Sequence, residues 1–215
     1  WDAQQVIIEV LDKVNGENDT ITGNITDIKT NAQNLELRIN NTLFNSSTTI
    51  LGEQEINFTD GSLTLAVFDF NFTNITKFNF VNIKINRTKV SGAESLVIKG
   101  IDLSSQNSKK TLYLNRTDTN LNSICVKDSE INSIDEVSSD CGSDTKLACD
   151  GVATSGFTCT LEENLYKITG LSHSGLKQIL FKRPSDSGGP SGGSSGGSGG
   201  GGGGGGSGIS YTCNM

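Results

Sequence analysis

Residues 56–72 read INFTDGSLTLAVFDFNF, and polar residues alternate with apolar ones at both ends of this stretch. Its first apolar pair brackets Asn57 and its last pair brackets Asn71. The same period of two returns in residues 81–86 and 112–115. Successive side chains of a β-strand point to opposite faces of the sheet. The alternation therefore predicts strands with one apolar face and one face in water.

Short apolar runs with turn signals between them continue from about residue 52 to residue 182. Further candidate strands are residues 63–70, 96–99, 124–127, 157–161, 165–169 and 177–181. Many short strands at this spacing are typical of a β-sandwich. We therefore predict a mainly β chain with an antiparallel, immunoglobulin-like sandwich over residues 46–183, whose disulfide-bearing part is residues 120–183.

The residues that follow the asparagines give the strongest indication of the cellular compartment. Nine asparagines begin an Asn-x-Ser/Thr triplet, the acceptor motif for N-linked glycans. They are Asn18, Asn24, Asn40, Asn45, Asn57, Asn71, Asn74, Asn86 and Asn115. Four of them, Asn57, Asn71, Asn86 and Asn115, fall on the polar phase of candidate strands, where a glycan would not disturb a core. We therefore predict a secreted glycoprotein in which glycans are the covalent modification.

Four cysteines lie within 35 residues of one another, at positions Cys125, Cys141, Cys149 and Cys159. None of them forms the Cys-x-x-Cys spacing of zinc ribbons or thioredoxin-like sites. Disulfides are therefore favoured, and of the three possible pairings we prefer Cys125 with Cys141 and Cys149 with Cys159. Cys213 is left over, which indicates an intermolecular bond, a free thiol or a partner beyond the given sequence.

Residues 1–45 carry a heptad pattern in which nine of eleven a and d positions are apolar. This pattern predicts an N-terminal amphipathic helix whose seam needs a partner. The assembly residues would be Ile7, Leu11, Val14, Ile21, Ile25 and Ile28. Asn18 is an a position and also begins a glycan motif, so it cannot serve both roles. The alternative is that residues 6–11 form an extended strand that pairs with the sheet edge of another copy.

The end of the chain has a different composition. Residues 184–208 are almost entirely glycine and serine and predict a disordered linker, which leads to a short tip of residues 209–215. The formal charge of −7 disfavours nucleic acid and anionic membranes as partners, because phosphate binding needs clustered cations. No apolar stretch reaches the roughly 18 residues of a membrane helix.

Sequence patterns for catalysis are weak. His173, the only histidine, lies between two serines but outside the Gly-x-Ser-x-Gly elbow of a serine nucleophile. Asp118, Asn120 and Asn122 begin like a calcium loop, yet Ser123 replaces its glycine. The acids Asp128, Asp140, Asp144 and Asp150 near the cysteines are expected to be solvated loop residues. We therefore predict no enzyme, no catalytic residues, no metal and no cofactor.

Several segments together resemble secreted cell-surface proteins of archaea. These segments are the run from Asp69 to Thr76, Ile124-Cys-Val-Lys-Asp with Cys141, Cys149-Asp-Gly, Gly156-Phe-Thr-Cys-Thr, and the run from Tyr166 to Gly175. In such proteins a sequon-rich β region and a small cysteine-bearing β region precede a polyglycine linker. The resemblance covers about residues 50–215 and implies an extracellular location but no catalytic residues. Tyr211-Thr-Cys-Asn-Met is similar to the opening of the thrombospondin-like repeat that often follows such linkers.

The leading functional hypothesis is an extracellular structural surface glycoprotein that assembles with itself into a filament, stalk or sheath. The rival hypothesis is an adhesin with a coiled-coil stalk, whose β-sandwich recognises glycans or proteins on another cell surface. The first predicts open-ended polymers and the second predicts discrete oligomers with affinity for a ligand.

Overall fold

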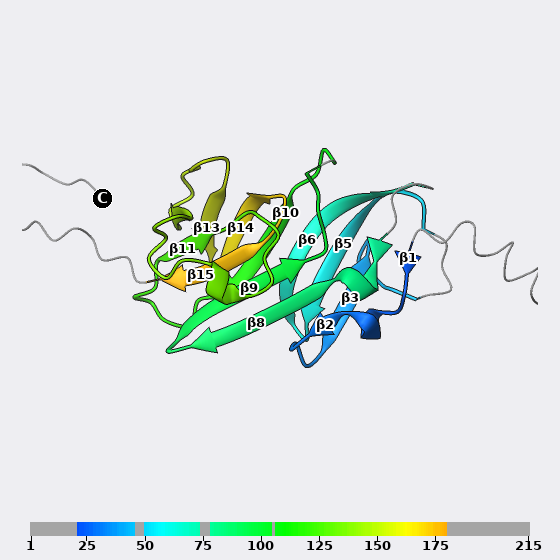
Figure 1. The fold of residues 1–215 in the computed structure, drawn as a ribbon, viewed down its shortest axis with the longest axis horizontal. Helices are drawn as coiled ribbons and strands as arrows, with labels where there is room; N and C mark the ends of the chain where they lie inside the picture. Colours follow the sequence, from blue (N-terminus) through cyan, green and yellow to red (C-terminus); the bar gives the residue numbers. More distant parts are fainter. Residues whose placement is uncertain (1–20, 46–49, 74–77, 105, 180–215) are drawn as a thin grey trace, which may run out of the picture. The chain divides into compact units, whose positions relative to one another are not determined.

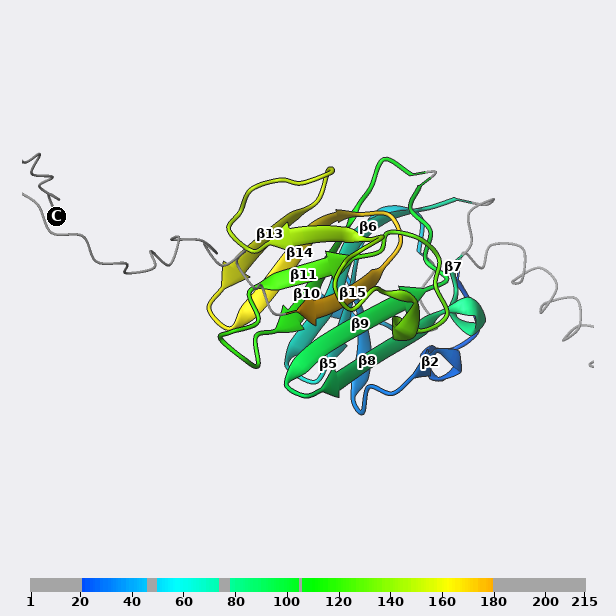
Figure 2. The same cartoon turned by 60° about the vertical axis from the view of Figure 1, so that its left-hand side comes forward.

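The structure is a computed structural model that describes residues 21–45, 50–73, 78–104 and 106–179. These ranges contain β-strands and three short 3-10 turns, and no α-helix. Two large sheets pack face to face, as Figures 1 and 2 show from two directions. The predicted mainly β fold with packed antiparallel sheets is therefore confirmed. The sheets hold seven and six strands, which is more than the about seven to nine strands of a whole immunoglobulin domain.

The larger sheet is antiparallel throughout, in the order β13-β14-β10-β6-β5-β3-β4. In that order the strands are Thr158–Glu162, Leu165–Leu171, Lys110–Asn115, Leu63–Phe72, Gly52–Asp60, Leu35–Ile39 and Thr42–Leu43. The long hairpin of β5 and β6 lies near the middle, where Ile56 faces Phe68 and Asn57 faces Val67. The stretch 56–72 thus forms two central strands, as its alternation predicts.

The smaller sheet has the order β12-β11-β15-β9-β8-β2. In that order the strands are Thr145–Ala148, Ser123–Val126, Gly175–Ile179, Ala93–Lys99, Lys84–Val90 and Lys29–Thr30. Its strands are antiparallel except for β2, which runs parallel to β8. A separate parallel pair joins β1 (Ile21–Thr22) to β7 (Phe78–Asn79), and the 3-10 turns are η1 (Ile25–Asp27), η2 (Phe80–Asn82) and η3 (Ile134–Glu136).

Two hairpins have tight turns in which both central residues have positive φ. The residues are Asn40 and Asn41 between β3 and β4 (φ 48° and 64°), and Ser91 and Gly92 between β8 and β9 (φ 50° and 84°). Turns of this backbone type match the right-handed twist of the flanking strands. Asparagine and glycine tolerate this region best, so the sequence favours the turns where they occur.

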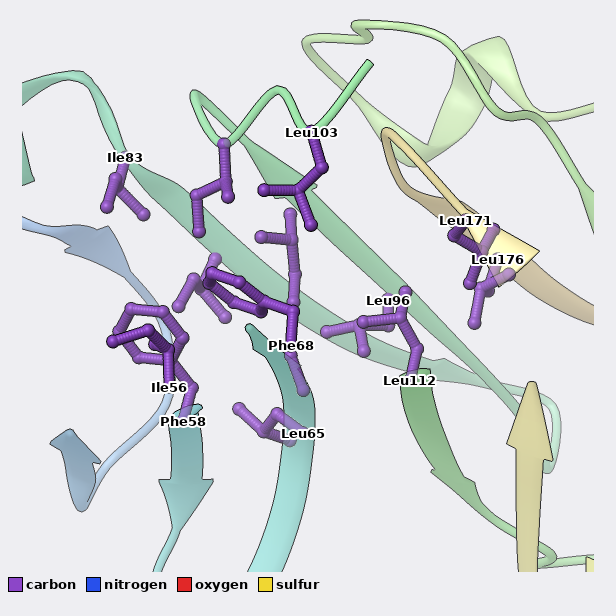
Figure 3. Close-up of a cluster of buried hydrophobic side chains, with 14 of the residues drawn as sticks. Ile56, Phe58, Leu65, Phe68, Ile83, Leu96, Leu103, Leu112, Leu171 and Leu176 are labelled. Carbon is purple, nitrogen blue, oxygen red and sulfur yellow. The ribbon is translucent and has the colours of Figure 1, made fainter. Parts of the chain in front are cut away.

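The core lies between the two sheets. Figure 3 shows side chains of both sheets in one apolar cluster, among them Phe58 and Phe68 of the larger sheet and Leu96 and Leu176 of the smaller sheet. Aromatic rings fill one part of this core, where the ring centroid of Phe78 lies 5.0 Å from that of Phe70. Alternate residues of β6 supply three of these rings, Phe68, Phe70 and Phe72, which explains why its apolar phase is so regular.

The outer faces of the two sheets differ. On the smaller sheet, Val97, Cys125 and Ile179 point outward and form a second apolar cluster with side chains of residues 131–141. The segment that carries η3 therefore covers part of this face. On the larger sheet, outward residues such as Glu53, Asp69 and Asn71 are exposed to solvent. Within the described residues, one face of the sandwich is thus partly covered by its own chain and the other is open.

The predicted N-terminal helix is wrong for residues 21–45. This range forms β1, η1, β2, β3 and β4, and it belongs to the sandwich, so the expected boundary at residue 45 is not present. Ile28 is buried in the main core, and Ile21 and Ile25 pack against it. Gly23 has a φ of 81°, which interrupts a right-handed helix. Ile7, Leu11, Val14 and the linker and tip of residues 184–215 lie outside the described residues.

Candidate functional site

The open face of the larger sheet carries three of the predicted glycan acceptors. Asn57 lies on β5, Asn71 near the end of β6 and Asn115 at the end of β10. Their strand neighbours point into the core, so the polar phase that the sequence assigned to them is confirmed. Asn71 is exposed, whereas Asn57 and Asn115 are half-buried. The side-chain oxygen of Asn57 is buried without a hydrogen-bond partner. Strand phase alone therefore does not separate accessible acceptors from crowded ones.

The remaining described acceptors lie at other surfaces. Asn24, Asn40 and Asn45 are exposed, and Asn86 is half-buried on the outer side of β8. The side-chain oxygen of Asn40 accepts a hydrogen bond from the backbone N–H of Glu55 (3.0 Å). Asn18 and Asn74 lie outside the described residues. Occupancy of all nine motifs remains a prediction.

Both predicted disulfides are formed. Cys125 and Cys141 join β11 to the segment that covers the smaller sheet, with Cα atoms 5.2 Å apart. Cys149 and Cys159 join the end of β12 to β13, with Cα atoms 4.5 Å apart, and so connect the edges of the two sheets. Structural disulfides are typical of oxidising compartments. The cysteines therefore support an oxidising environment for this chain.

A buried cationic group lies at one end of the sandwich. Lys110 begins β10 in the inward phase and is fully buried, and its Nζ donates to Ser174 Oγ at 3.4 Å. Burial lowers the pKa of Lys110 to about 8, against the opposing effect of nearby carboxylates, of which Glu130 has the largest influence. Lys110 is not among the site residues predicted from the sequence. The sequence does indicate that it points inward, because it lies two residues before Leu112 and four before Leu114, in the same phase of the strand.

His173 lies beside Lys110 in the connection between β14 and β15. Its Nε2 is 3.6 Å from Asp102 Oδ1, and its Nδ1 is 3.6 Å from Glu130 Oε1. The backbone N–H of His173 donates to Asp128 Oδ1 at 2.6 Å. Hydrogen bonds from Ser104, and to a lesser extent the nearby charges, lower the pKa of Asp102. Three carboxylates from two loops thus surround this one connection.

The serines beside His173 are not arranged as exposed nucleophiles. Ser172 and Ser174 are buried, and each hydroxyl accepts a hydrogen bond from a lysine ammonium group. A serine nucleophile instead needs a neighbouring base that accepts its proton and an exposed position. We therefore interpret these contacts of His173, Lys110 and the carboxylates as structural: they hold three loops together.

A second buried ionic group connects the two sheets. Arg87 Nε of β8 donates to Glu94 Oε1 of β9, and the backbone N–H of Asn115 donates to Glu94 Oε2. Gln178 bonds to the backbone of both Glu94 and Asn115, which completes the network. Glu94 is 2% exposed, so its charge depends on these partners. The sequence signal that was missed is a glutamate in the inward phase, two residues before Leu96.

The aspartates considered as calcium ligands accept backbone hydrogen bonds within their own loops. Asp118 Oδ1 accepts the backbone N–H of Asn120 (2.8 Å), and Asp150 Oδ1 accepts that of Val152 (2.9 Å). Asp140 and Asp144 likewise accept backbone N–H groups within residues 138–142. In the described part of the chain, no group of three or more His, Cys, Asp and Glu side chains could hold a metal ion. Nor does any helix of those residues have the length and apolar character to span a membrane.

Comparison of this chain with protein families, curated proteins and solved structures gave no match.

Proposed function

We propose that this chain is an extracellular structural glycoprotein whose copies assemble at a cell surface into a filament, stalk or sheath. The observation that carries the proposal is the open polar face of the larger sheet, on which Asn57, Asn71 and Asn115 begin glycan motifs. The opposite sheet is partly covered by a disulfide-linked segment of the same chain. Glycans at these three motifs would therefore be attached to the face that the described part of the chain leaves uncovered.

Glycans on this face favour growth in one direction. A sugar chain on a sheet face opposes the packing of that face on another protein, because it keeps polar groups and water in place. Contacts between copies are then restricted to the outer face of the smaller sheet and to the ends and edges of the sandwich, and contacts between two different surfaces generate open-ended polymers. The resemblance of the sequence to secreted archaeal surface proteins supports the same class of protein.

Intact mass and electron microscopy test the proposal on protein from a glycosylating host. We expect a mass well above 22.7 kDa that falls after deglycosylation, together with regular polymers in negative stain. Asn71→Gln should remove one glycan mass. Asn107→Gln is the matched control, because Asn107 is exposed, lines the same surface hollow as Asn71 and lies outside any glycan motif.

Three results would change the conclusion. A mass equal to that of the bare polypeptide contradicts the glycoprotein part. A protein that stays monomeric at high concentration contradicts the assembly part. Discrete oligomers that bind a glycan array indicate the adhesin instead.

A further inference from the structure

Three lysines form a row across the outer face of the smaller sheet. Lys29 of β2 is in register with Lys84 of β8, and Lys84 is in register with Lys99 of β9. Residues paired across neighbouring strands point to the same face and lie roughly 5 Å apart. We call Lys29, Lys84 and Lys99 the lysine row. It places three positive charges side by side in a chain of net charge −7.

Positive charges in this arrangement repel one another. Like charges directly opposite on neighbouring strands destabilise a sheet. Within the described ranges, no carboxylate lies within ion-pair distance of the three ammonium groups. Lys84 Nζ donates to the backbone oxygen of Asn132 (2.7 Å), and Lys99 Nζ donates to its side chain. Each ammonium group has three donors, so these bonds leave most of them available for an anion.

The lysine row lines a surface hollow of about 620 Å³, whose other lining residues include Val81, Asn82 and Glu130. Glu130 is the one acid of the hollow lining, and its carboxylate already accepts the backbone N–H of Gly100 (3.3 Å). Two of its lining residues, Gly100 and Asn82, are tightly packed, because a Cβ atom on Gly100 would lie 2.2 Å from the backbone oxygen of Asn82. Val81 is 52% exposed and adds an apolar contact surface. The hollow thus suits an acidic segment that also carries apolar side chains.

The first twenty residues of the chain have this composition. They contain five acids, Asp2, Glu9, Asp12, Glu17 and Asp19, and one base, Lys13. Their net charge of −4 is more than half of the −7 of the whole chain. Residues 6–11 read VIIEVL, so the acids Glu9 and Asp12 lie within and next to an apolar run. This segment precedes Ile21, where the described structure begins.

We propose that residues 1–20 of one copy bind in the hollow of a second copy, with their carboxylates on the lysine row and their apolar side chains on Val81. This inference rests on the proposed self-assembly and identifies the surface that would serve it. It also replaces the predicted helical seam of residues 1–45, because residues 21–45 are committed to the sandwich.

Sedimentation velocity of the full chain, over a range of concentrations at low and high salt, tests the contact. Lys84→Glu combined with Lys99→Glu should weaken association about tenfold, the size that a few exposed ion pairs provide. High salt should weaken the wild-type contact in the same direction. Lys89→Glu is the matched control for a single substitution in the row, because Lys89 lies on β8, is exposed and changes the net charge by the same amount without lying in the row.

A charge exchange makes the test specific. Adding Glu9→Lys and Asp12→Lys to the Lys84→Glu, Lys99→Glu chain should restore association. Lys29→Glu alone, at an exposed position, covers the case in which the double variant fails to fold. Trp1 is the only tryptophan, so its fluorescence reports on the segment in each variant.

Each outcome supports or overturns the inference. Loss of association in the row variants and its return on charge exchange support it. Association that is unchanged in the row variants overturns it and leaves the proposed self-assembly intact. A monomeric wild type whose Trp1 fluorescence depends on the lysine row at every concentration indicates binding within one chain and overturns it. A monomeric wild type without such dependence contradicts both this inference and the proposed self-assembly.

Discussion

Replacement of the buried Lys110 should stabilise the protein at neutral pH. The folded-state pKa of about 8 lies well below the ordinary lysine value of 10.5. Each unit of pKa difference corresponds to about 1.4 kcal/mol, so the charged lysine destabilises the folded state by about 3 kcal/mol at pH 7. Lys110→Met removes this cost and loses one hydrogen bond to Ser174 worth about 1 kcal/mol. We therefore expect the free energy of unfolding to rise by about 2 kcal/mol.

The same shift predicts how the difference depends on pH. Between pH 8 and 10.5 the unfolded chain binds more protons at Lys110 than the folded chain does, so wild-type stability from this group rises with pH. From pH 7 to pH 9.5 the gain is about 2 kcal/mol. Lys110→Met lacks this titration, and its advantage over the wild type should therefore disappear by about pH 9.5.

Urea unfolding at pH 7 and pH 9.5 measures both effects. A Cys213→Ser background removes the cysteine outside the two disulfides, so that alkaline disulfide exchange does not disturb the comparison. A stability difference that stays constant between these pH values would refute the argument. So would a variant that is less stable than the wild type at pH 7.

Other consequences can be measured in the same way. Reduction of both disulfides should lower the free energy of unfolding by about 3 kcal/mol for each bond, since they close loops of 16 and 10 residues. Glu94→Gln leaves Arg87 with only its longer ion pair to Asp60 (3.4 Å) and should cost about 2–4 kcal/mol in urea unfolding, whereas Glu36→Gln, in an exposed pair, should cost under about 1 kcal/mol. Ile28→Ala should destabilise the sandwich by about 2–4 kcal/mol, which a free helical seam would not predict. Glycopeptide mapping should find higher occupancy at the exposed Asn71 than at Asn57, and equal occupancy would contradict the argument from burial.

Strands in which apolar and polar residues alternate were predictable, because each side chain faces either the core or the solvent. In residues 56–58 of β5, 68–72 of β6 and 112–114 of β10 every second residue is apolar and buried, so the period alone identifies these strands. The disulfides were predictable for a different reason, because cysteines at this spacing in a chain with many glycan motifs leave few alternatives.

The prediction of a helix in residues 21–45 was wrong because the same spacing of apolar residues fits both a helix and a strand. Leu35 and Ile39 are four residues apart, and such residues share a face both in a helix and in a strand. Leu37 between them decides the matter, since it is also buried, and in a helix it would point away from both. The heptad reading ignored this residue and therefore counted two strand positions as a helical seam.

The ionic groups inside the sandwich were beyond a reading of local sequence. Lys110 and Glu94 occupy inward positions of strands, but their partners are remote in the chain. His173 and Glu130 approach each other across 43 residues, and Glu94 meets Gln178 across 84. Periodicity reports which face a side chain occupies and carries no information about which distant loop lies against it.

The position of β15 has a consequence for biosynthesis. This strand is the last described element of the chain, yet it lies between β11 and β9 in the interior of the smaller sheet. Until residues 175–179 have left the ribosome or the secretion channel, β11 with β12 and β9 with β8 remain two separate fragments with open edges. Closure of the sheet therefore waits for β15, and a chain stopped before residue 175 lacks the strand that joins the two halves. Long-range pairings of this kind fold slowly, so the nascent chain needs protection of its edges for longer than a protein made of local hairpins.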